Sequence, residues 1–252
     1  MRTKVAAGAE KKKQLLNEMK FLLTIDHDAI LRTYGMYDVK VNGMQSLGFL
    51  CDFKDGGDLS SWIPKDGMRE ELAKGIFAQV CSALKYLYDR RIVHRDIKPS
   101  NVFCDQKVDG SFKATLADFG LATRADDAEN MSIACGTAGY IAPEVFRKDW
   151  VARCSERCLE SRSEYENRIA EMLKTDVFSA GMLLYVMATG TNDFIVDDVE
   201  ETYRNNQRGQ INLSPRLQHL SHQLKTFICL LCEDVPRKRV SIFDTFSNPW
   251  LH

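Results

Sequence analysis

The stretch His94-Arg95-Asp96-Ile97-Lys98-Pro99-Ser100-Asn101 lies near the middle of this 252-residue chain and decides how the rest is interpreted. It gathers a carboxylate, an ammonium group and an amide on Asp96, Lys98 and Asn101. A lone Asp-x-x-x-x-Asn spacing is usually a polar turn whose side chains satisfy the backbone. Because two further motifs follow in order, we interpret the stretch as a catalytic loop.

The later motifs are Asp118-Phe119-Gly120 and Gly136-Thr137-Ala138-Gly139-Tyr140-Ile141-Ala142-Pro143-Glu144. Residues 112–117 alternate enough for a short strand, and a carboxylate at a strand end can hold magnesium. Transfer of a γ-phosphoryl group requires a carboxylate near the attacking hydroxyl, a cation on the moving phosphate and an oxygen ligand for magnesium. The catalytic loop supplies one of each.

Together the three motifs resemble the signature of the eukaryotic serine/threonine protein kinase family, and the resemblance runs from residue 14 to residue 252. It implies a two-lobed α+β protein-kinase-like fold with a truncated small lobe (residues 1–53) and a mainly helical large lobe (residues 54–252). It also implies ATP and Mg2+ as cofactors and a protein substrate. Lys98 and Thr137 point to serine/threonine rather than tyrosine transfer.

The resemblance assigns roles to single residues. By similarity, Asp96, Lys98 and Asn101 are catalytic, while Asn101 and Asp118 hold the metal. The ATP site would comprise Glu18, Cys51, Asp52, Lys54, Asp58, Phe103 and Asp118. Glu18 matches the glutamate of the kinase helix C, and a solvated helix carboxylate is the alternative.

The segment Cys51-Asp52-Phe53-Lys54-Asp55-Gly56-Gly57-Asp58-Leu59 resembles the hinge between kinase lobes, with Cys51 as gatekeeper. By similarity, the Asp52 carbonyl and the Lys54 amide face the adenine edge, and Asp58 reaches the ribose. Phe103 stands where such kinases usually place a smaller aliphatic residue beneath adenine. An Asp/Gly surface loop is the alternative for this segment.

Hydrophobic periodicity predicts the elements around these motifs. The predicted helices are residues 14–23 and 70–90, and the predicted strands are residues 30–41 and 45–51 with a turn at Asn42-Gly43. An apolar run that begins near residue 176 predicts a buried central helix. Arg239 is the expected partner of Glu144 in a buried ion pair.

Two features of the large lobe concern regulation. Residues 147–174 are heavily charged, so we expect an inserted, largely exposed helical segment, with a docking role as the alternative. Arg95 indicates a basic site for a phosphate on the polar loop that follows the second motif. Ser132 is the nearest hydroxyl on that loop, and an ordinary loop serine is the alternative.

The same resemblance concerns substrate choice. Basophilic relatives place carboxylates at the positions of Ser100 and Val186 in this sequence. Of the carboxylates that select arginine in those relatives, only Asp58 remains in this sequence. We therefore expect that the choice of substrate depends only weakly on arginine upstream of the target hydroxyl.

The start of the sequence departs from the family. Neither a G-x-G-x-x-G nor a V-A-x-K motif precedes Glu18, because Lys4 is followed by Val5-Ala6. We therefore expect an N-terminally incomplete domain in which strand 3 is missing, residues 45–51 have an open edge and Lys4 is a poor substitute. Two functions stay open: a protein serine/threonine kinase that lacks its front, and a pseudokinase-like scaffold or binding module. The intact catalytic carboxylates and amide favour the kinase.

Composition and net charge exclude several classes of protein. A net charge of −1 gives no field that would attract nucleic acid or an anionic membrane, and the most apolar stretch, residues 180–188, is too short to span a bilayer. Eight scattered cysteines suit a reducing compartment, and Cys229 and Cys232 are expected to pack in the core. We predict an intracellular, cytoplasmic protein without nucleic-acid or membrane partners, and we leave its oligomeric state open.

Overall fold

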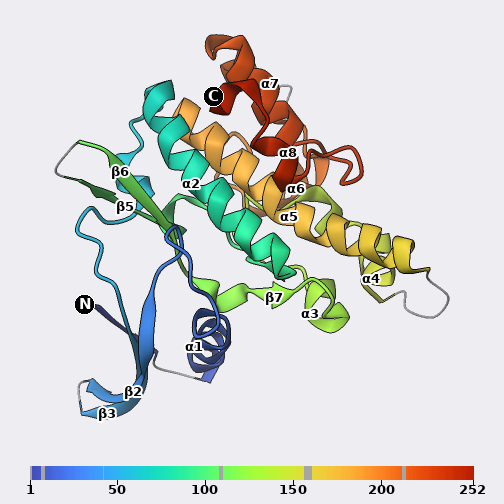
Figure 1. Ribbon diagram of the computed structural model, residues 1–252. Helices are drawn as coiled ribbons and strands as arrows, with labels where there is room; N and C mark the ends of the chain where they lie inside the picture. Colours follow the sequence, from blue (N-terminus) through green and yellow to red (C-terminus); the bar gives the residue numbers. More distant parts are fainter. Residues whose placement is uncertain (1, 7–8, 42, 108–109, 156–160, 212–213) are drawn as a thin grey trace.

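The computed structural model describes residues 2–6, 9–41, 43–107, 110–155, 161–211 and 214–252. Figure 1 shows a small sheet with one helix beside it, and a larger, mainly helical part that contains the C-terminus. Among the described residues, none of the helices is long and apolar enough to cross a bilayer.

The small sheet has the order β1-β3-β2, and both of its strand pairs are antiparallel. Its strands are β1 (Arg2–Ala6), β2 (Thr33–Val41) and β3 (Met44–Cys51). The hairpin β2–β3 confirms the predicted strand pair; Asn42 of the predicted turn lies outside the described residues, and Gly43 has a φ of +80°.

The sequence predicted that the strand called strand 3 in the kinase family is missing here, which would leave residues 45–51 with an open edge. This prediction is wrong. β1 pairs with β3 along its length, from Arg2 opposite Cys51 to Ala6 opposite Leu47. Backbone pairing needs a row of N–H and C=O groups and no particular side-chain motif, so β1 escapes a search for V-A-x-K. Lys4 therefore lies on a strand, opposite Phe49.

Helix α1 (Ala9–Leu22) follows β1 and covers the predicted helix. It buries Leu15, Met19 and Leu22, which lie on one face because they are spaced by four and three residues. Leu16 and Leu23 are 45% and 62% exposed, so the apolar residues within the predicted helix 14–23 do not all face the core.

The larger part is built around two long helices, α2 (Glu70–Asp89) and α5 (Arg162–Thr189), which pack against each other. Two short antiparallel pairs accompany them, namely β4 (Ile92–Val93) with β7 (Thr123–Arg124) and β5 (Val102–Gln106) with β6 (Phe112–Leu116). The other α-helices among the described residues are α3 (Ala128–Ser132), α4 (Lys148–Ser155), α6 (Val199–Arg208), α7 (His222–Leu231) and α8 (Ile242–Thr245).

Helix α5 contains the predicted buried central helix but begins earlier. A capping box between Ser161 and Glu164 starts it, and Gly190 ends it at a φ of +76°. The described part of residues 147–174 is therefore α4 together with the first turns of α5.

The expectation of an exposed helical segment at residues 147–174 is right only in part, because residues 161–167 are mostly exposed whereas the end of the segment is buried. Ile169, Met172 and Leu173 are buried, and they pack with Trp150 of α4 against Met131 of α3. The charges that dominate this segment lie around an apolar stripe of helical spacing, and that stripe is covered because α4 and α3 lie beside it. Residues 156–160 lie outside the described residues.

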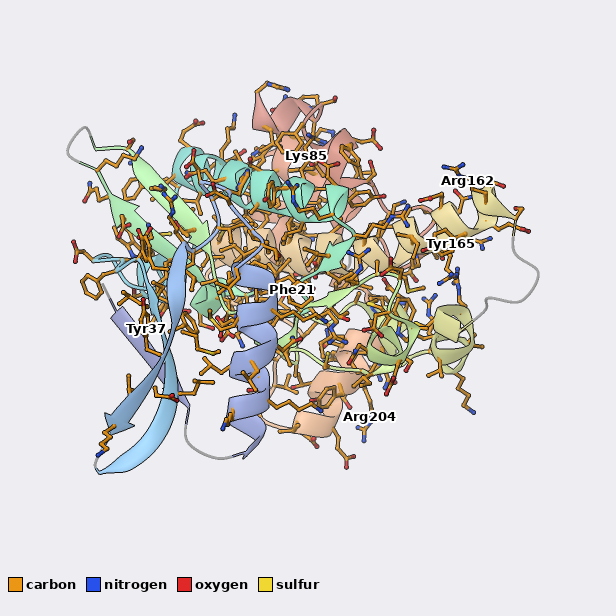
Figure 2. The ribbon with its side chains drawn as sticks, turned by 60° about the horizontal axis from the view of Figure 1, so that its bottom comes forward. Phe21, Tyr37, Lys85, Arg162, Tyr165 and Arg204 are labelled. Atoms are coloured by element: carbon orange, nitrogen blue, oxygen red, sulfur yellow. The ribbon has the colours of Figure 1, made fainter. Side chains whose placement is uncertain are left out.

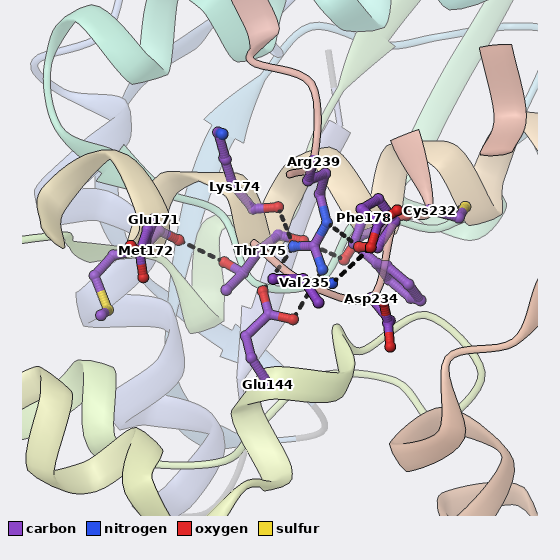
Figure 3. Close-up of polar contacts among 12 residues, drawn as sticks. Glu144, Glu171, Met172, Lys174, Thr175, Phe178, Cys232, Asp234, Val235 and Arg239 are labelled. Atoms are coloured by element: carbon purple, nitrogen blue, oxygen red, sulfur yellow. Dashed lines mark hydrogen bonds and ion pairs between the residues drawn. The ribbon is translucent and has the colours of Figure 1, made fainter. Parts of the chain in front are cut away.

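The predicted ion pair between Glu144 and Arg239 is confirmed (Figure 3). The Arg239 Nη1 and Nη2 atoms donate to the two carboxylate oxygens of Glu144 at 2.6 and 2.9 Å. Arg239 also donates to the carbonyls of Glu233 (2.7 Å) and Lys174 (2.8 Å), and its guanidinium lies over the Phe178 ring. The two charges are buried but fully hydrogen-bonded, which is the condition under which such a pair is tolerated.

Candidate active site

The catalytic loop begins directly after β4 and is fastened to α5 by one carboxylate. Asp176 accepts hydrogen bonds from the backbone N–H groups of His94 (2.6 Å) and Arg95 (2.9 Å). Burial raises the pKa of Asp176, although both N–H bonds and the nearby His94 and Arg95 oppose that shift. Arg95 has a φ of +66°, an uncommon conformation that these bonds hold in place.

The Asp96 carboxylate lies at the centre of a cluster of polar side chains. The Thr137 hydroxyl donates to its Oδ1 at 2.6 Å, and the Lys98 ammonium lies 2.9 Å from its Oδ2. Asn101 Nδ2 donates to the same Oδ2 (2.9 Å) and to the Asp96 carbonyl (2.8 Å). Burial alone would raise the pKa of Asp96, but the bonds from Thr137 and Lys98 outweigh it and lower that pKa. The carboxylate is therefore ionised at neutral pH and can accept a proton from a hydroxyl.

Asp118 is brought to this cluster through the residue before it. The Ala117 N–H donates to the Asn101 carbonyl at 2.9 Å, and the Ala117 carbonyl lies 3.0 Å from His94 Nε2. Asp118 adopts a φ of +65°, which costs a non-glycine residue about 1–2 kcal/mol. Phe119, fully buried and packed edge-on against His94, anchors that backbone.

The donor atoms fit a magnesium ion that is shared with phosphates. Asp118 offers a carboxylate and Asn101 an amide, and Mg2+ is usually bound by one or two carboxylates together with substrate phosphates. Within the described ranges there is no group of three or more His, Cys, Asp or Glu side chains that could hold a metal alone.

Helix α1 is docked on the segment that follows Asp118. Asn17 Nδ2 donates to the carbonyls of Gly120 (3.1 Å) and Ala122 (2.9 Å). The neighbouring Glu18 is only 2% exposed, so it is a buried carboxylate and not a solvated one.

The predicted hinge residues lie between β3 and β5. Cys51, 6% exposed, ends β3, and the Lys54 ammonium lies 3.4 Å from Asp105 and 3.9 Å from Asp52. The Asp58 carboxylate accepts the Ser60 N–H at 3.0 Å, while its backbone bridges to the half-buried Phe103. Contacts of Asp52, Lys54, Asp58 and Phe103 with a nucleotide stay predictions.

A model of the protein kinase domain matches residues 2–251. The chain belongs to the protein kinase family. This assignment and the kinase fold confirm the resemblance that the motifs indicated.

Serine/threonine kinases are among the kinase's relatives. Serine/threonine-protein kinase RAD53 of Saccharomyces cerevisiae is 30% identical over 93% of this chain and 27% of its own length. Ovarian-specific serine/threonine-protein kinase Lok of Drosophila melanogaster is 30% identical over 94% of this chain and 46% of its own length. The chain thus spans less than half of either relative.

A crystal structure of the Rad53 kinase domain and SCD2 in complex with AMPPNP superposes on the kinase with a TM-score of 0.70. It covers 99% of this chain and 80% of that chain at 23% identity, so it shows the fold. A second structure of the Rad53 kinase domain and SCD2 gives a TM-score of 0.71.

The kinase also uses residues to which sequence reasoning gave no role in the site. Asp176 was noted only as the start of the central helix, yet it holds the catalytic loop. Asn17 binds α1 to the segment after Asp118. Its position next to Glu18 in the sequence was the signal that could have identified it. Both act across more than eighty residues of sequence, a separation at which local pattern carries no information about contact.

Proposed function

We propose that this chain is an ATP-dependent protein serine/threonine kinase that transfers the γ-phosphoryl group to protein hydroxyls. The observation that carries the proposal is the Asp96 carboxylate, which is held by Thr137 and Lys98 and bonded to Asn101, whose carbonyl accepts the N–H of Ala117, the residue before Asp118. A binding module has no chemical need for this arrangement, whereas phosphoryl transfer needs each of its groups.

Each side chain then has a task. Asp96 accepts the proton of the attacking hydroxyl, and Lys98 presents positive charge beside it. Asn101 and Asp118 would hold the magnesium ion, which neutralises phosphate charge when the nucleotide is bound. Thr137 ties the position of Asp96 to the segment that precedes Glu144.

The direct test is phosphate incorporation into a mixed serine/threonine protein substrate in the presence of MgATP. We expect transfer to serine and threonine hydroxyls by the wild-type chain. Incorporation no greater than in an Asp96→Asn blank would contradict the kinase proposal and leave the pseudokinase-like scaffold or binding module as the function.

We also propose that Lys4 is the phosphate-binding lysine of this kinase, because β1 supplies a strand beside β3 and Glu18 is buried nearby on α1. A buried carboxylate requires a cationic or hydrogen-bonding partner, and a strand lysine can serve as one. Lys4→Met is expected to lower kcat/KM on the order of 10²-fold, the usual loss for one electrostatic group in the transition state. Steady-state kinetics and the ATP-dependent thermal shift measure this effect.

Lys13→Met is the matched control, because Lys13 is an exposed lysine on α1. Equal kinetics in the Lys4 and Lys13 variants would show that another group binds the phosphates.

Substrate preference is predicted from a cavity of about 350 Å³ beside the catalytic cluster. Its lining residues are Ser60, Ile63, Lys98, Pro99, Ser100, Thr137, Tyr140, Val186 and Gly190. None of these described residues is acidic, and Lys98 repels a cation, so a peptide array should show little selection for arginine before the target hydroxyl. An array dominated by arginine two or three positions upstream would contradict this prediction.

Ser100→Glu combined with Val186→Glu should create a preference for arginine upstream of the target hydroxyl. The added carboxylates would favour a basic side chain in the same cavity, and the same array measures the shift.

A further inference from the structure

Two donors of the Arg95 guanidinium bind backbone carbonyls in this structure. Its Nε donates to the Leu121 carbonyl at 2.7 Å, and its Nη1 donates to the Asn130 carbonyl at 2.5 Å. Both acceptors belong to the chain between Asp118 and Thr137, which we call the activation segment (residues 119–136). An arginine at this place in a kinase can order such a loop by pairing with a phosphate on it. Here peptide carbonyls accept those hydrogen bonds.

A tryptophan from α4 holds the next residue of the same segment. Trp150, 2% exposed, donates its indole N–H to the Met131 carbonyl at 2.9 Å, and this bond is buried. Asn130 and Met131 are consecutive, so two neighbouring carbonyls near the end of α3 are bound from different elements. The Asn130 carbonyl also accepts the Ile133 N–H at 3.3 Å, whereas the indole of Trp150 satisfies the Met131 carbonyl at the helix end.

Trp150 is supported by the first turns of α5. It packs in a buried cluster whose other members are Val93, Ala125, Met131, Cys154, Ile169, Met172 and Leu173. Figure 2 shows Arg162 and Tyr165 on the first turns of α5, at the edge of the molecule. We call these turns the outer turns of α5.

Ion pairs fix α4 and the outer turns of α5 to each other and to the rest of the kinase. Glu171 pairs with Arg153 of α4 and, at 2.7 Å, with Arg237. Glu166 lies 2.7 Å from Arg91, which follows α2.

The enclosed cavity beside Arg95 is too small for a phosphate. It is lined by Arg95, Met131 and Trp150, among others, and its volume of about 20 Å³ is room for about one water molecule. The hydroxyl of Ser132 donates to the Glu129 carbonyl at 2.7 Å, so it is engaged within α3.

We propose that α4 and the first turns of α5 replace an activating phosphate, with Trp150 and Arg95 as positioning residues for the activation segment. This inference rests on the proposed kinase function. It reverses the expectation for Ser132, whose phosphorylation becomes unnecessary. The ordered segment reaches the catalytic cluster through Gly136, where an added Cβ would lie 2.7 Å from the Arg95 carbonyl, and through the bond from Thr137 to Asp96.

The test uses the complete chain expressed together with a protein phosphatase, with intact mass confirming that no phosphate remains. We expect this protein to transfer phosphate, and we expect the amides of residues 128–137 to exchange hydrogen slowly. Ser132→Ala should keep full activity. A wild-type chain that is inactive until a hydroxyl of the activation segment is phosphorylated would overturn the proposal.

The decisive variant is Trp150→Phe, which keeps a large ring but removes the N–H. We expect kcat/KM for the peptide to fall about tenfold through kcat and peptide KM, because a buried carbonyl loses its donor. The KM for ATP should stay unchanged, and exchange in residues 128–137 should become faster. Trp250→Phe is the matched control, because Trp250 is equally buried and its indole N–H donates to Glu70 at 2.6 Å, away from the activation segment.

One result would contradict the role of Trp150, and a different result would contradict the kinase proposal. If the Trp150 and Trp250 variants lose stability alike and neither changes the peptide KM or the exchange of residues 128–137, Trp150 is merely structural. If no form of the chain transfers phosphate, the kinase proposal fails, and the exchange comparison alone decides whether Trp150 orders the segment.

Discussion

Asp96→Asn is expected to lower kcat by roughly 10²–10⁴-fold, because the amide cannot take the proton of the attacking hydroxyl. The substitution keeps the shape of the side chain, and its amide oxygen can still accept a hydrogen bond from Thr137 or Lys98. The KM for ATP and the melting temperature should therefore change little. Steady-state kinetics and a thermal melt measure the two effects separately.

Asp89→Asn serves as the control, because Asp89 is an exposed aspartate at the end of α2. A wild-type kcat in the Asp96 variant would show that Asp96 is not the catalytic base. Loss of folding in that variant would instead give it a structural role.

Arg239→Met is expected to destabilise the fold by about 3–5 kcal/mol, because it leaves the Glu144 carboxylate buried without its partner. Urea unfolding at neutral pH measures the free energy of unfolding. The two charges are among the least exposed in the described residues, so solvent cannot replace the lost bonds.

The double variant Glu144→Leu with Arg239→Met should recover part of that loss, because no unpaired charge then remains. Arg204→Ala is the control, since Arg204 and its partner Glu200 are largely exposed on α6 and should contribute little. If the Arg239 and Arg204 variants unfolded at the same urea concentration, the buried pair would not stabilise the kinase.

The catalytic cluster could be predicted from sequence because phosphoryl transfer demands particular side chains at close spacing. Asp96, Lys98 and Asn101 lie in one loop, so their proximity could be predicted from local sequence, whereas the bond from Thr137 to Asp96 could not. The long-range ion pair of Glu144 with Arg239 was predicted only through resemblance to the kinase family.

Features that depend on backbone or on tertiary packing were missed. Strand β1 is defined by its backbone hydrogen bonds to β3. Its amino-acid sequence matches no motif, so a motif search does not find it. Trp150 and Ile169 are surrounded in sequence by charges, and only their contact with Met131 reveals that they are buried. The carbonyl partners of Arg95 could not be predicted, because they lie more than twenty residues away in sequence.

Helix α5 connects the outer turns that support Trp150 to Asp176 without interruption. Each residue of an α-helix turns the chain by about 100°. Gain or loss of one residue between Ile169 and Asp176 would rotate the apolar face away from α4 while the catalytic loop stayed in place. The number of residues between these two points is therefore constrained, although the helix begins in charged turns at the edge of the molecule.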